Sequence, residues 1–534
     1  TTFRQFDVIV KNEAEETIVS VVESLKRGTF EGVPGISFVS NGTFKTNSGN
    51  SLIANLDNLP IPAYHRYPIM ELGLTSLRVD AGRGCPFQCT FCSTASFFGR
   101  QYRLKSADRL RRELDHLNAI YGVSDFSLTH DLFTVNRRKV LEFCDAVEGR
   151  GYTWKCSARQ DCVDDELLAR MRKSGCTSIY YGIEAGSERM QKISKKKLDL
   201  GIFEKTLSTT QRLGMSATVS FITGYPEETK ADQDATLELI GSCFDKDLSP
   251  LNVQLHLLTP EPGTALLTQY QNDIAYDGHI SDFNFPTLEL DDGTVISSYP
   301  QVFINHHYFP AALPRDRHIF VTTIYQHLYG LGFPLLRYVL RQFRRNFANL
   351  IDAMDDWRTR RGRSPQADQC TVEDFFGDRF GRSHHIAGLV RYMLQATELR
   401  RRSSNELLRH NRRSNGDEPS LSLSSRSALV LGVPDCSQIL ELLSDDRASS
   451  IPSDLLSRRY DFLLCLSDHD KNHVVNFKLN KPSVAAFSYL FEPRCKADWL
   501  TFETSTGYPA PPEEFLMEYL ARGVLEVAGD TLAS

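Results

Sequence analysis

Long apolar runs are the first thing this chain lacks. No stretch of about 18 consecutive apolar residues occurs in its 534 residues, which argues against a membrane-spanning helix. Charge of one sign is not in excess either, since 61 Lys and Arg stand against 67 Asp and Glu for a net charge of −6. This balance argues against a globally basic protein that binds nucleic acid. No secretory signal peptide is recognisable, so we predict a cytoplasmic protein.

Cysteine is present but sparse, with 12 residues in the whole chain. A secreted disulfide framework is denser and occurs in shorter chains, so the sequence does not fit that class. Nine of the twelve cysteines are scattered, mostly among apolar neighbours, and are predicted to be small buried hydrophobes. Only Cys85, Cys89 and Cys92 are clustered, and a second cysteine pair is missing.

The N-terminal part of the chain has the pattern of one β–α unit. An apolar run predicts a strand, and the acidic residues Glu13, Glu15 and Glu16 open a helical pattern, where they suit the positive end of the helix dipole. One strand and one helix cannot bury a core alone. We therefore interpret residues 1–30 as the C-terminal remnant of an α/β domain and expect the native protein to be longer. Residues 31–73, rich in Gly, Asn and Pro, are predicted to form a hairpin and a linker.

Residues 74–265 alternate between strand and helix patterns. Such alternation predicts a parallel sheet with crossover helices, in which functional groups gather at the carboxyl ends of the strands. A partial (β/α)6 barrel and a doubly wound sheet both fit, and periodicity does not separate them. The predicted strands are 77–80, 125–129, 152–156, 178–182, 217–222 and 253–258. The predicted helices are 106–120, 136–148, 164–173, 201–213 and 230–243.

After this segment the regular alternation stops. Residues 266–398 are predicted to extend the barrel, first as loops and then as helices with a basic surface. Residues 399–428 are rich in Arg and Ser with almost no aromatic residues, which predicts a flexible linker. Apolar patterning returns in residues 429–534, which we expect to form a small α+β domain. Its helix-like run from 512 to 525 faintly resembles winged-helix modules that hold leader peptides, and a domain used only for packing is the alternative.

The segment that carries chemistry reads GRGCPFQCTFC and follows the first predicted barrel strand. Its thiols, spaced C-x3-C-x2-C, can wrap one compact loop around a metal centre, and thiolates favour zinc or iron–sulfur clusters. A structural zinc site takes four ligands, commonly as two pairs. A [4Fe–4S] cluster on three cysteines instead leaves one iron open for a cofactor or substrate. We therefore predict Cys85, Cys89 and Cys92 as metal ligands and as the catalytic centre, with zinc or chance spacing as the alternative.

At these residues the chain resembles the radical S-adenosylmethionine (SAM) superfamily, over residues 74–265. The resemblance implies a partial (β/α)6 barrel with a [4Fe–4S] cluster and SAM as cofactors. In that family the open iron binds the amino and carboxylate groups of SAM. The reduced cluster donates one electron, SAM cleaves, and a 5′-deoxyadenosyl radical abstracts hydrogen from the substrate. An external electron donor of the flavodoxin or ferredoxin type is implied as a partner.

The resemblance extends to residues at successive strand ends, in the order of the family. Phe91 takes the aromatic place before the third cysteine. His130 and Asp131 lie where the family usually has Gly-Gly-Glu for the SAM amino group. The resemblance implies that one of them contacts SAM, and a side chain that merely caps the following turn is the alternative.

Later strand ends continue this series of matches. Ser157 and Arg159 lie where a polar or basic group of the family meets the SAM carboxylate or ribose, with a structural ion pair as the alternative. Glu184 belongs to a Gly-x-Glu-x-Gly segment and is implied to face SAM or the active site. Tyr225 belongs to a loop that resembles the one contacting adenine.

The N-terminal segment resembles the end of a cobalamin-binding domain. Asn12-Glu13-Ala14-Glu15 stands where one radical SAM subclass, which carries a flavodoxin-like cobalamin domain before the barrel, usually has Gly-Glu-Gly-Glu. No D-x-H-x-x-G cobalamin-ligand motif occurs in the chain, so cobalamin is implied only for a full-length parent protein. Many members of the subclass transfer methyl groups through methylcobalamin.

From the residues and the resemblance together, we predict a radical SAM enzyme. Its expected reaction is cobalamin-assisted methylation, or a related C–H functionalisation, of a small-molecule natural product or a peptide. The alternatives are a cobalamin-independent radical SAM enzyme, a non-catalytic iron–sulfur or zinc module, and a peptide-binding protein with a degenerate barrel.

Overall fold

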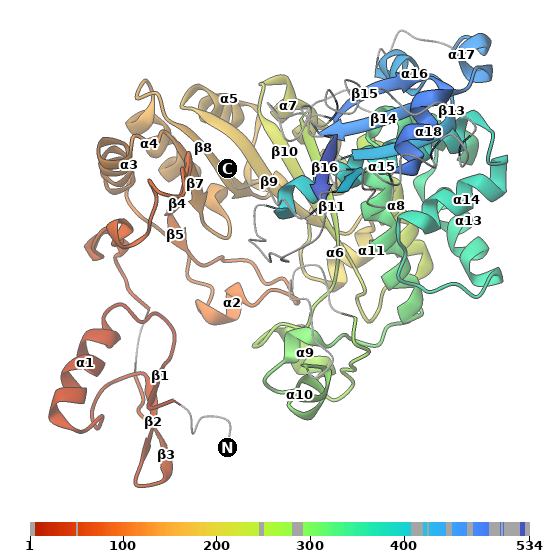
Figure 1. Ribbon diagram of the computed structural model, residues 1–534. Helices are drawn as coiled ribbons and strands as arrows, with labels where there is room; N and C mark the ends of the chain where they lie inside the picture. The colour runs from red at the N-terminus through yellow and green to blue at the C-terminus, as the bar shows by residue number, and fades with distance from the viewer. Residues whose placement is uncertain are drawn as a thin grey trace. The chain divides into compact units, whose positions relative to one another are not determined.

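The chain divides into two compact units, each described here by itself (Figure 1). The first unit comprises Thr1–Leu239 and Leu248–His318, and the second comprises Ile240–Asp247 and Ile319–Ser534. A computed structural model describes residues 6–49, 52–244, 250–279, 292–406, 420–423, 427–444, 451–466, 474–490, 502, 506, 519 and 524–528. No helix in these ranges is long and apolar enough to cross a membrane.

A six-stranded parallel sheet forms the centre of the first unit (Figure 1). Its strand order is β4-β7-β8-β9-β10-β11, which follows the order of the chain without reversal. A doubly wound sheet reverses at a switch point, so this order identifies the partial barrel. The six predicted strands are confirmed, with ends that shift by up to two residues. They are β4 (Ser76–Asp80), β7 (Asp125–Thr129), β8 (Thr153–Ala158), β9 (Cys176–Glu184), β10 (Ser216–Thr223) and β11 (Leu251–Leu257).

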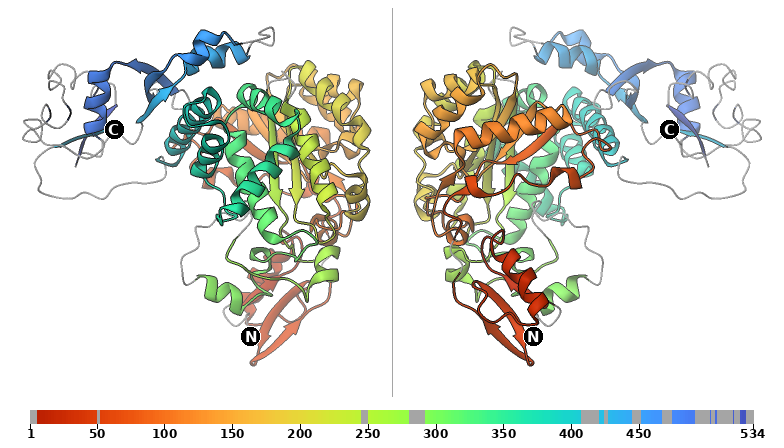
Figure 2. Two further views of the ribbon diagram at one scale, coloured as in Figure 1. Left: turned by 90° about the vertical axis from the view of Figure 1, so that its right-hand side faces the viewer. Right: turned by 90° about the vertical axis from the view of Figure 1, so that its left-hand side faces the viewer.

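The two faces of this sheet differ in chemistry. In β7, Phe126 and Leu128 are buried and alternate with the more accessible Ser127 and Thr129, as the two-residue period of a strand requires. Figure 2 shows the crossover helices, orange to yellow, on the outer side of the sheet, where they cover its apolar face. They are α3 (Ala107–Tyr121), α4 (Arg137–Val147), α5 (Asp165–Lys173), α7 (Phe203–Arg212) and α8 (Lys230–Phe244). The opposite face is polar. The short helix α6 (Glu188–Ile193) lies in the connection between β9 and α7, at the end of the strands.

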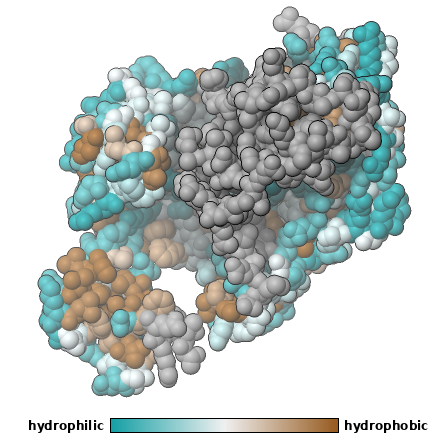
Figure 3. All heavy atoms as spheres, in the orientation of Figure 1, coloured by the Kyte–Doolittle hydropathy of each residue, from teal (hydrophilic) through white to brown (hydrophobic). Residues whose placement is uncertain are grey.

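The N-terminal segment forms one antiparallel sheet with a helix beside it. Its elements are β1 (Val8–Val10), α1 (Thr17–Arg27), β2 (Ile36–Ser40) and β3 (Thr43–Thr46), in the sheet order β1-β2-β3. The predicted boundary at residue 30 is therefore wrong as a structural division, because β1 pairs with β2 across it. Val21, Val33, Ile36 and Phe38 form the shared core. Apolar side chains on α1 also remain exposed and colour this region brown in Figure 3.

A small two-stranded sheet brackets the cysteine loop. β5 (Gly82–Arg83) pairs antiparallel with β6 (Arg103–Leu104), and the short helix α2 (Thr94–Phe97) lies between them in the chain. Beyond β11, α9 (Ala265–Tyr270) and α10 (Asp292–Ser298) complete the regular structure of the first unit. The loops predicted at the start of residues 266–398 lie partly outside the described residues, because residues 280–291 are not described.

The second unit combines helices with a three-stranded antiparallel sheet ordered β13-β14-β15. The predicted linker at 399–428 is wrong at its start, because α15 continues to Glu406. Leu399 and the three arginines after it are good helix formers, and Glu398 pairs with Arg401 at 2.8 Å. Most of the predicted helical run at 512–525 lies outside the described residues. The helices are α11 (Arg315–Tyr329), α12 (Phe333–Leu340), α13 (Phe347–Arg360), α14 (Gln369–Phe380), α15 (His385–Glu406), α16 (Cys436–Ser444), α17 (Ser453–Ser457) and α18 (Lys481–Tyr489). The strands are β12 (Ser420–Leu423), β13 (Ser427–Val433), β14 (Tyr460–Leu466), β15 (Val474–Leu479) and β16 (Leu525–Ala528).

Candidate active site

Two glycines let the chain enter the cysteine loop. A Cβ atom on Gly82 would lie 2.3 Å from the carbonyl oxygen of Arg103, and one on Gly84 would lie 1.9 Å from that of Gln101. Gly84 also has a φ of +81°, which side chains other than glycine rarely adopt. Close approach of the two loop ends therefore explains both glycines of the Gly-x-Gly-Cys segment.

The middle of the loop is held by backbone hydrogen bonds to two other segments, the residue after α6 and the first turn of α9. The Thr90 amide donates to the Ser194 carbonyl oxygen at 2.8 Å, and the Leu266 amide donates to the Thr90 carbonyl oxygen at 2.9 Å. The Phe91 ring meets the Tyr225 ring edge-on, with centroids 5.9 Å apart. The loop is thus tied to the segments that follow β9, β10 and β11.

The three thiols of the loop line one cavity of about 180 Å³. It lies where the strands β8 and β9 end, as expected for a parallel α/β sheet. The cavity brings together eight of the ten predicted site residues: Cys85, Cys89, Phe91, Cys92, Asp131, Ser157, Arg159 and Glu184. His130 and Tyr225 do not line it.

The donor set of this cavity fits an iron–sulfur cluster. Burial raises the pKa of the Cys85 thiol and raises that of Cys89 to about 11, while the cations of Lys196 and Arg159 oppose the rise at Cys89. Both thiols must lose their protons to become ligands, so these cations assist loading. Among the described residues, no three His, Cys, Asp or Glu side chains are grouped closely enough to hold a single metal ion. A cubane [4Fe–4S] cluster does not require the three thiolates to lie close enough to share one ion, because each thiolate binds a different iron.

A buried ion pair occupies the wall opposite the loop. Lys196 Nζ lies 2.9 Å from Glu184 Oε1, and both side chains are largely buried. Glu184 ends β9 with a φ of +72°, a strained conformation for a residue other than glycine that costs about 1–3 kcal/mol. A Cβ atom on Gly182 would lie 2.4 Å from Glu184 Oε1. The Gly-x-Glu spacing therefore makes room for the carboxylate to fold back into the cavity.

Arg159 combines a structural ion pair with one free donor. Its Nε and Nη2 donate to the two carboxylate oxygens of Asp161 at 2.8 and 2.7 Å, and Nη2 also donates to the Lys196 carbonyl oxygen. The guanidinium lies 4.0 Å from the centroid of the Phe87 ring. Its Nη1 is buried and finds no hydrogen-bond partner among the described residues. This N–H is therefore left over for a ligand.

His130 and Asp131 follow β7 but have different roles. His130 Nδ1 accepts a hydrogen bond of 2.7 Å from the Leu132 amide, so the side chain caps its own turn. Burial lowers the pKa of His130 to about 4, which keeps the ring neutral. Asp131 accepts a hydrogen bond of 2.9 Å from the Thr94 hydroxyl and lines the thiol cavity.

A second, larger cavity of about 640 Å³ adjoins the first along the polar face of the sheet. Asp131, Ser157 and Tyr180 line both cavities. Hydroxyl side chains from adjacent strands line the larger one, among them Ser127, Thr129, Ser178 and Thr218. Lys155 also lines it, 3.3 Å from Asp125. The larger cavity therefore suits a polar molecule.

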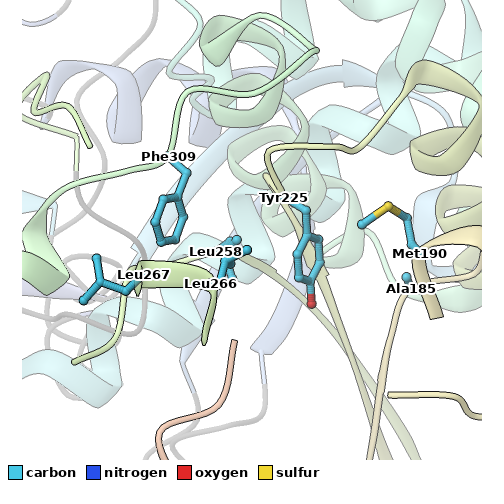
Figure 4. Close-up of a cluster of buried hydrophobic side chains, with 7 residues drawn as sticks. All are labelled: Ala185, Met190, Tyr225, Leu258, Leu266, Leu267 and Phe309. Carbon is cyan, nitrogen blue, oxygen red and sulfur yellow. The ribbon is translucent and has the colours of Figure 1, made fainter. Parts of the chain in front are cut away.

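Tyr225 packs behind the cysteine loop rather than in the cavity. Figure 4 shows its ring in a buried cluster between Leu258 and Met190. The Tyr225 hydroxyl is buried without a hydrogen-bond partner in the part of the chain that the structure describes. The ring supports Phe91.

Several cavity residues were not predicted from the sequence. Lys196 lies in a run of three lysines, a pattern that usually marks a solvated surface. Phe87 and Thr94 lie inside or beside the cysteine motif, which was the one available signal for them. Tyr180 gave no signal beyond its place in a predicted strand.

Comparison with known proteins agrees with this geometry. Residues 79–240, which contain the cysteine loop and β7 to β10, match the model of the Radical SAM superfamily. These residues are a radical SAM domain. Such a domain works with a [4Fe–4S] cluster and SAM.

Curated relatives of this radical SAM domain include a methyltransferase and a cyclase by name. A protein of Pyrococcus horikoshii named an uncharacterized methyltransferase is 32% identical over 266 residues, which are 49% of this chain and 57% of that protein. An anaerobic magnesium-protoporphyrin IX monomethyl ester cyclase of Cereibacter sphaeroides is 27% identical over 295 residues, which are 53% of this chain and 47% of that protein. The chain therefore spans about half the length of these relatives.

A solved structure shares the fold. The cobalamin-dependent SAM radical enzyme OxsB, in a structure with aqua-cobalamin bound, aligns with a TM-score of 0.51 at 13% identity. The alignment covers 76% of this chain and 66% of that one. At this identity the likeness shows that the fold is shared and says nothing of the reaction.

Proposed function

We propose that this protein is a radical SAM enzyme in which Cys85, Cys89 and Cys92 hold a [4Fe–4S] cluster. The reaction that fits best is cobalamin-assisted methylation or a related C–H functionalisation. One observation carries the proposal: the three thiols share a cavity with Glu184 and Arg159 at the ends of adjacent strands. When bound, the cluster and SAM supply a 5′-deoxyadenosyl radical that abstracts hydrogen from the substrate.

The charged residues of the cavity are suited to hold SAM. Glu184 is an acceptor for the amino group, and its pair with Lys196 fixes the carboxylate in place. The free Nη1 of Arg159 is a donor for the SAM carboxylate or a ribose hydroxyl, while its pair with Asp161 orients the guanidinium. Asp131 and Ser157 are further polar contacts at the boundary with the larger cavity.

The aromatic residues of the loop shield the cavity from water. Phe91, supported by Tyr225, and Phe87, stacked under Arg159, line or back its wall. Excluding water protects a radical from side reactions. The substrate, a polar small molecule or a peptide, occupies the larger cavity, because that cavity adjoins the first and is lined by hydroxyl groups.

The names of the relatives support the class of reaction. The Pyrococcus relative is named a methyltransferase. Cobalamin in such a reaction would be held without a D-x-H-x-x-G ligand motif from this chain, because the chain contains none. A flavodoxin or ferredoxin supplies the electron.

Anaerobic reconstitution with iron and sulfide tests the proposal. Four irons and four sulfides per chain are expected, with an electron paramagnetic resonance (EPR) signal after reduction that changes when SAM is added. Cys89→Ala should abolish the signal. Cys370→Ala, which removes an exposed thiol in α14, is the matched control and should leave it unchanged. Zinc alone, or a cluster whose signal does not respond to SAM, would contradict the proposal.

A further inference from the structure

One buried carboxylate of the N-terminal segment reaches both ends of the cysteine loop. Glu13, which precedes α1, is 5% exposed. Its two oxygens accept hydrogen bonds from both Nη atoms of Arg103 at 2.8 and 2.9 Å and from Nη1 of Arg83 at 3.1 Å. The Ile53 amide donates a fourth hydrogen bond at 2.5 Å. Every lone-pair direction of the carboxylate is thus used.

The two arginines bound the loop that carries the cysteines. Arg83 lies in β5, two residues before Cys85, and Arg103 lies directly opposite it in β6. A single side chain therefore bridges the strand that opens the loop and the strand that closes it. The bidentate contact with Arg103 adds directional specificity to the ion pair, because the planar fork fits the carboxylate in one orientation.

The charged groups of this contact are opposite in sign and largely buried. The side chains of Glu13, Arg103 and Arg83 are 2%, 10% and 18% exposed. Burial would raise the pKa of Glu13, but the hydrogen bonds from Arg103, Ile53 and Arg83 outweigh it and hold that pKa below its usual value. The carboxylate is therefore ionised at neutral pH and paired with two cations.

We propose that Glu13 is a positioning residue that fixes the cysteine loop against the wall formed by Glu184 and Arg159. The proposal rests on the proposed function, in which the loop holds the cluster and the wall holds SAM. It also gives the N-terminal segment a role in the reaction, since a group 72 residues before Cys85 in the chain sets the geometry of the loop. Small displacements at a reacting centre cost large factors in rate.

A first experiment needs no cluster. In the unloaded full chain, the rates at which iodoacetamide alkylates Cys85, Cys89 and Cys92 are measured by mass spectrometry. Glu13→Gln should speed alkylation of the three loop cysteines severalfold while leaving the exposed Cys370 unchanged. Glu31→Gln is the matched control, because it breaks an exposed pair with Lys45 on the same N-terminal segment.

A second experiment uses the reconstituted protein. Glu13→Gln should load iron but change the EPR signal of the reduced cluster in the presence of SAM, and lower the rate of 5′-deoxyadenosine formation about tenfold or more. Arg103→Lys should reproduce the defect although it keeps the charge, because lysine cannot form the bidentate contact. This second variant keeps the test valid if Glu13→Gln folds poorly.

The outcomes separate this proposal from the one on which it rests. Wild-type alkylation rates and wild-type SAM cleavage in both variants would overturn the role of Glu13. A wild-type protein that never loads a cluster would overturn the proposed function, and so the catalytic role of Glu13. The alkylation rates would still decide whether Glu13 fixes the loop.

Discussion

At the scale of single residues, the thiol cavity is arranged around Glu184. Its left-handed backbone turns the carboxylate back over Gly182, where Lys196 neutralises it. Strain of this kind persists only where the surrounding contacts enforce it, and it concentrates at functional sites. The Glu184–Lys196 pair is therefore held in a fixed position in the cavity wall before any ligand binds.

Gly182→Ala tests that wall. The added methyl group would lie 2.4 Å from the Glu184 carboxylate and 3.1 Å from Lys196 Nζ, so it displaces both charged ends. We expect SAM binding to the reconstituted protein to weaken about tenfold, or about 1.4 kcal/mol, with little change in melting temperature. Gly201→Ala, whose methyl group approaches only the end of the Asp199 side chain outside the cavity, is the control. Unchanged SAM affinity would contradict this role of Glu184.

Glu228 predicts a pH dependence of stability. Burial raises its pKa from 4.5 to about 7, although the Gly224 amide and the Thr223 hydroxyl donate to it at 2.6 and 2.8 Å. A raised pKa means that the folded state favours the protonated acid. The contribution of protonated Glu228 to the free energy of unfolding is therefore fully present below about pH 4.5 and is lost as the pH rises through about 7. This pKa shift of Glu228 corresponds to about 3 kcal/mol of the free energy of unfolding.

Glu228→Gln should remove the pH-dependent part of the stability that Glu228 contributes. The melting temperature of the variant should fall less than that of the wild type between pH 5 and pH 8 as measured by thermal unfolding, because the amide does not ionise. Parallel pH profiles for the two proteins would show that Glu228 does not titrate in this range.

At the scale of elements, features that depend on a local sequence pattern could be predicted, and contacts between distant segments could not. The β–α alternation and the cysteine spacing predicted the six strands and the loop, because both are local patterns. Lys196 was missed because a run of lysines has the same sequence pattern whether it lies on the surface or beside a cavity. The contact between Glu13 and Arg103 joins residues 90 positions apart, which no local pattern shows. Tyr225 was placed at adenine by resemblance, whereas its ring packs behind Phe91.

The junction of β9 with α8 gives a prediction at this scale. A Cβ atom on Gly186 would lie 2.4 Å from the Ala235 carbonyl oxygen and 2.7 Å from the Thr236 Cα atom, both part of the helix backbone. Backbone cannot rotate away as a side chain can, so Gly186→Ala should destabilise the first unit by about 2 kcal/mol. Thermal unfolding beside Gly201→Ala measures the difference. Equal stability would show that α8 shifts freely relative to β9.

At the scale of the whole molecule, the first unit joins three parts into one site. The N-terminal segment holds the ends of the cysteine loop, the loop faces the ends of β8 and β9, and the polar face of the sheet adjoins it. Gly82 and Gly84 allow the two ends of the cysteine loop to approach each other closely. The polar face of the sheet lines the larger cavity. The chain spans about half the length of its curated relatives.

The most direct test of the account is the fate of SAM. The anaerobically reconstituted protein is mixed with SAM and dithionite, and 5′-deoxyadenosine is quantified by liquid chromatography. The account predicts 5′-deoxyadenosine in the wild type and in Cys370→Ala, and none in Cys89→Ala. A fully loaded cluster that leaves SAM intact would contradict it.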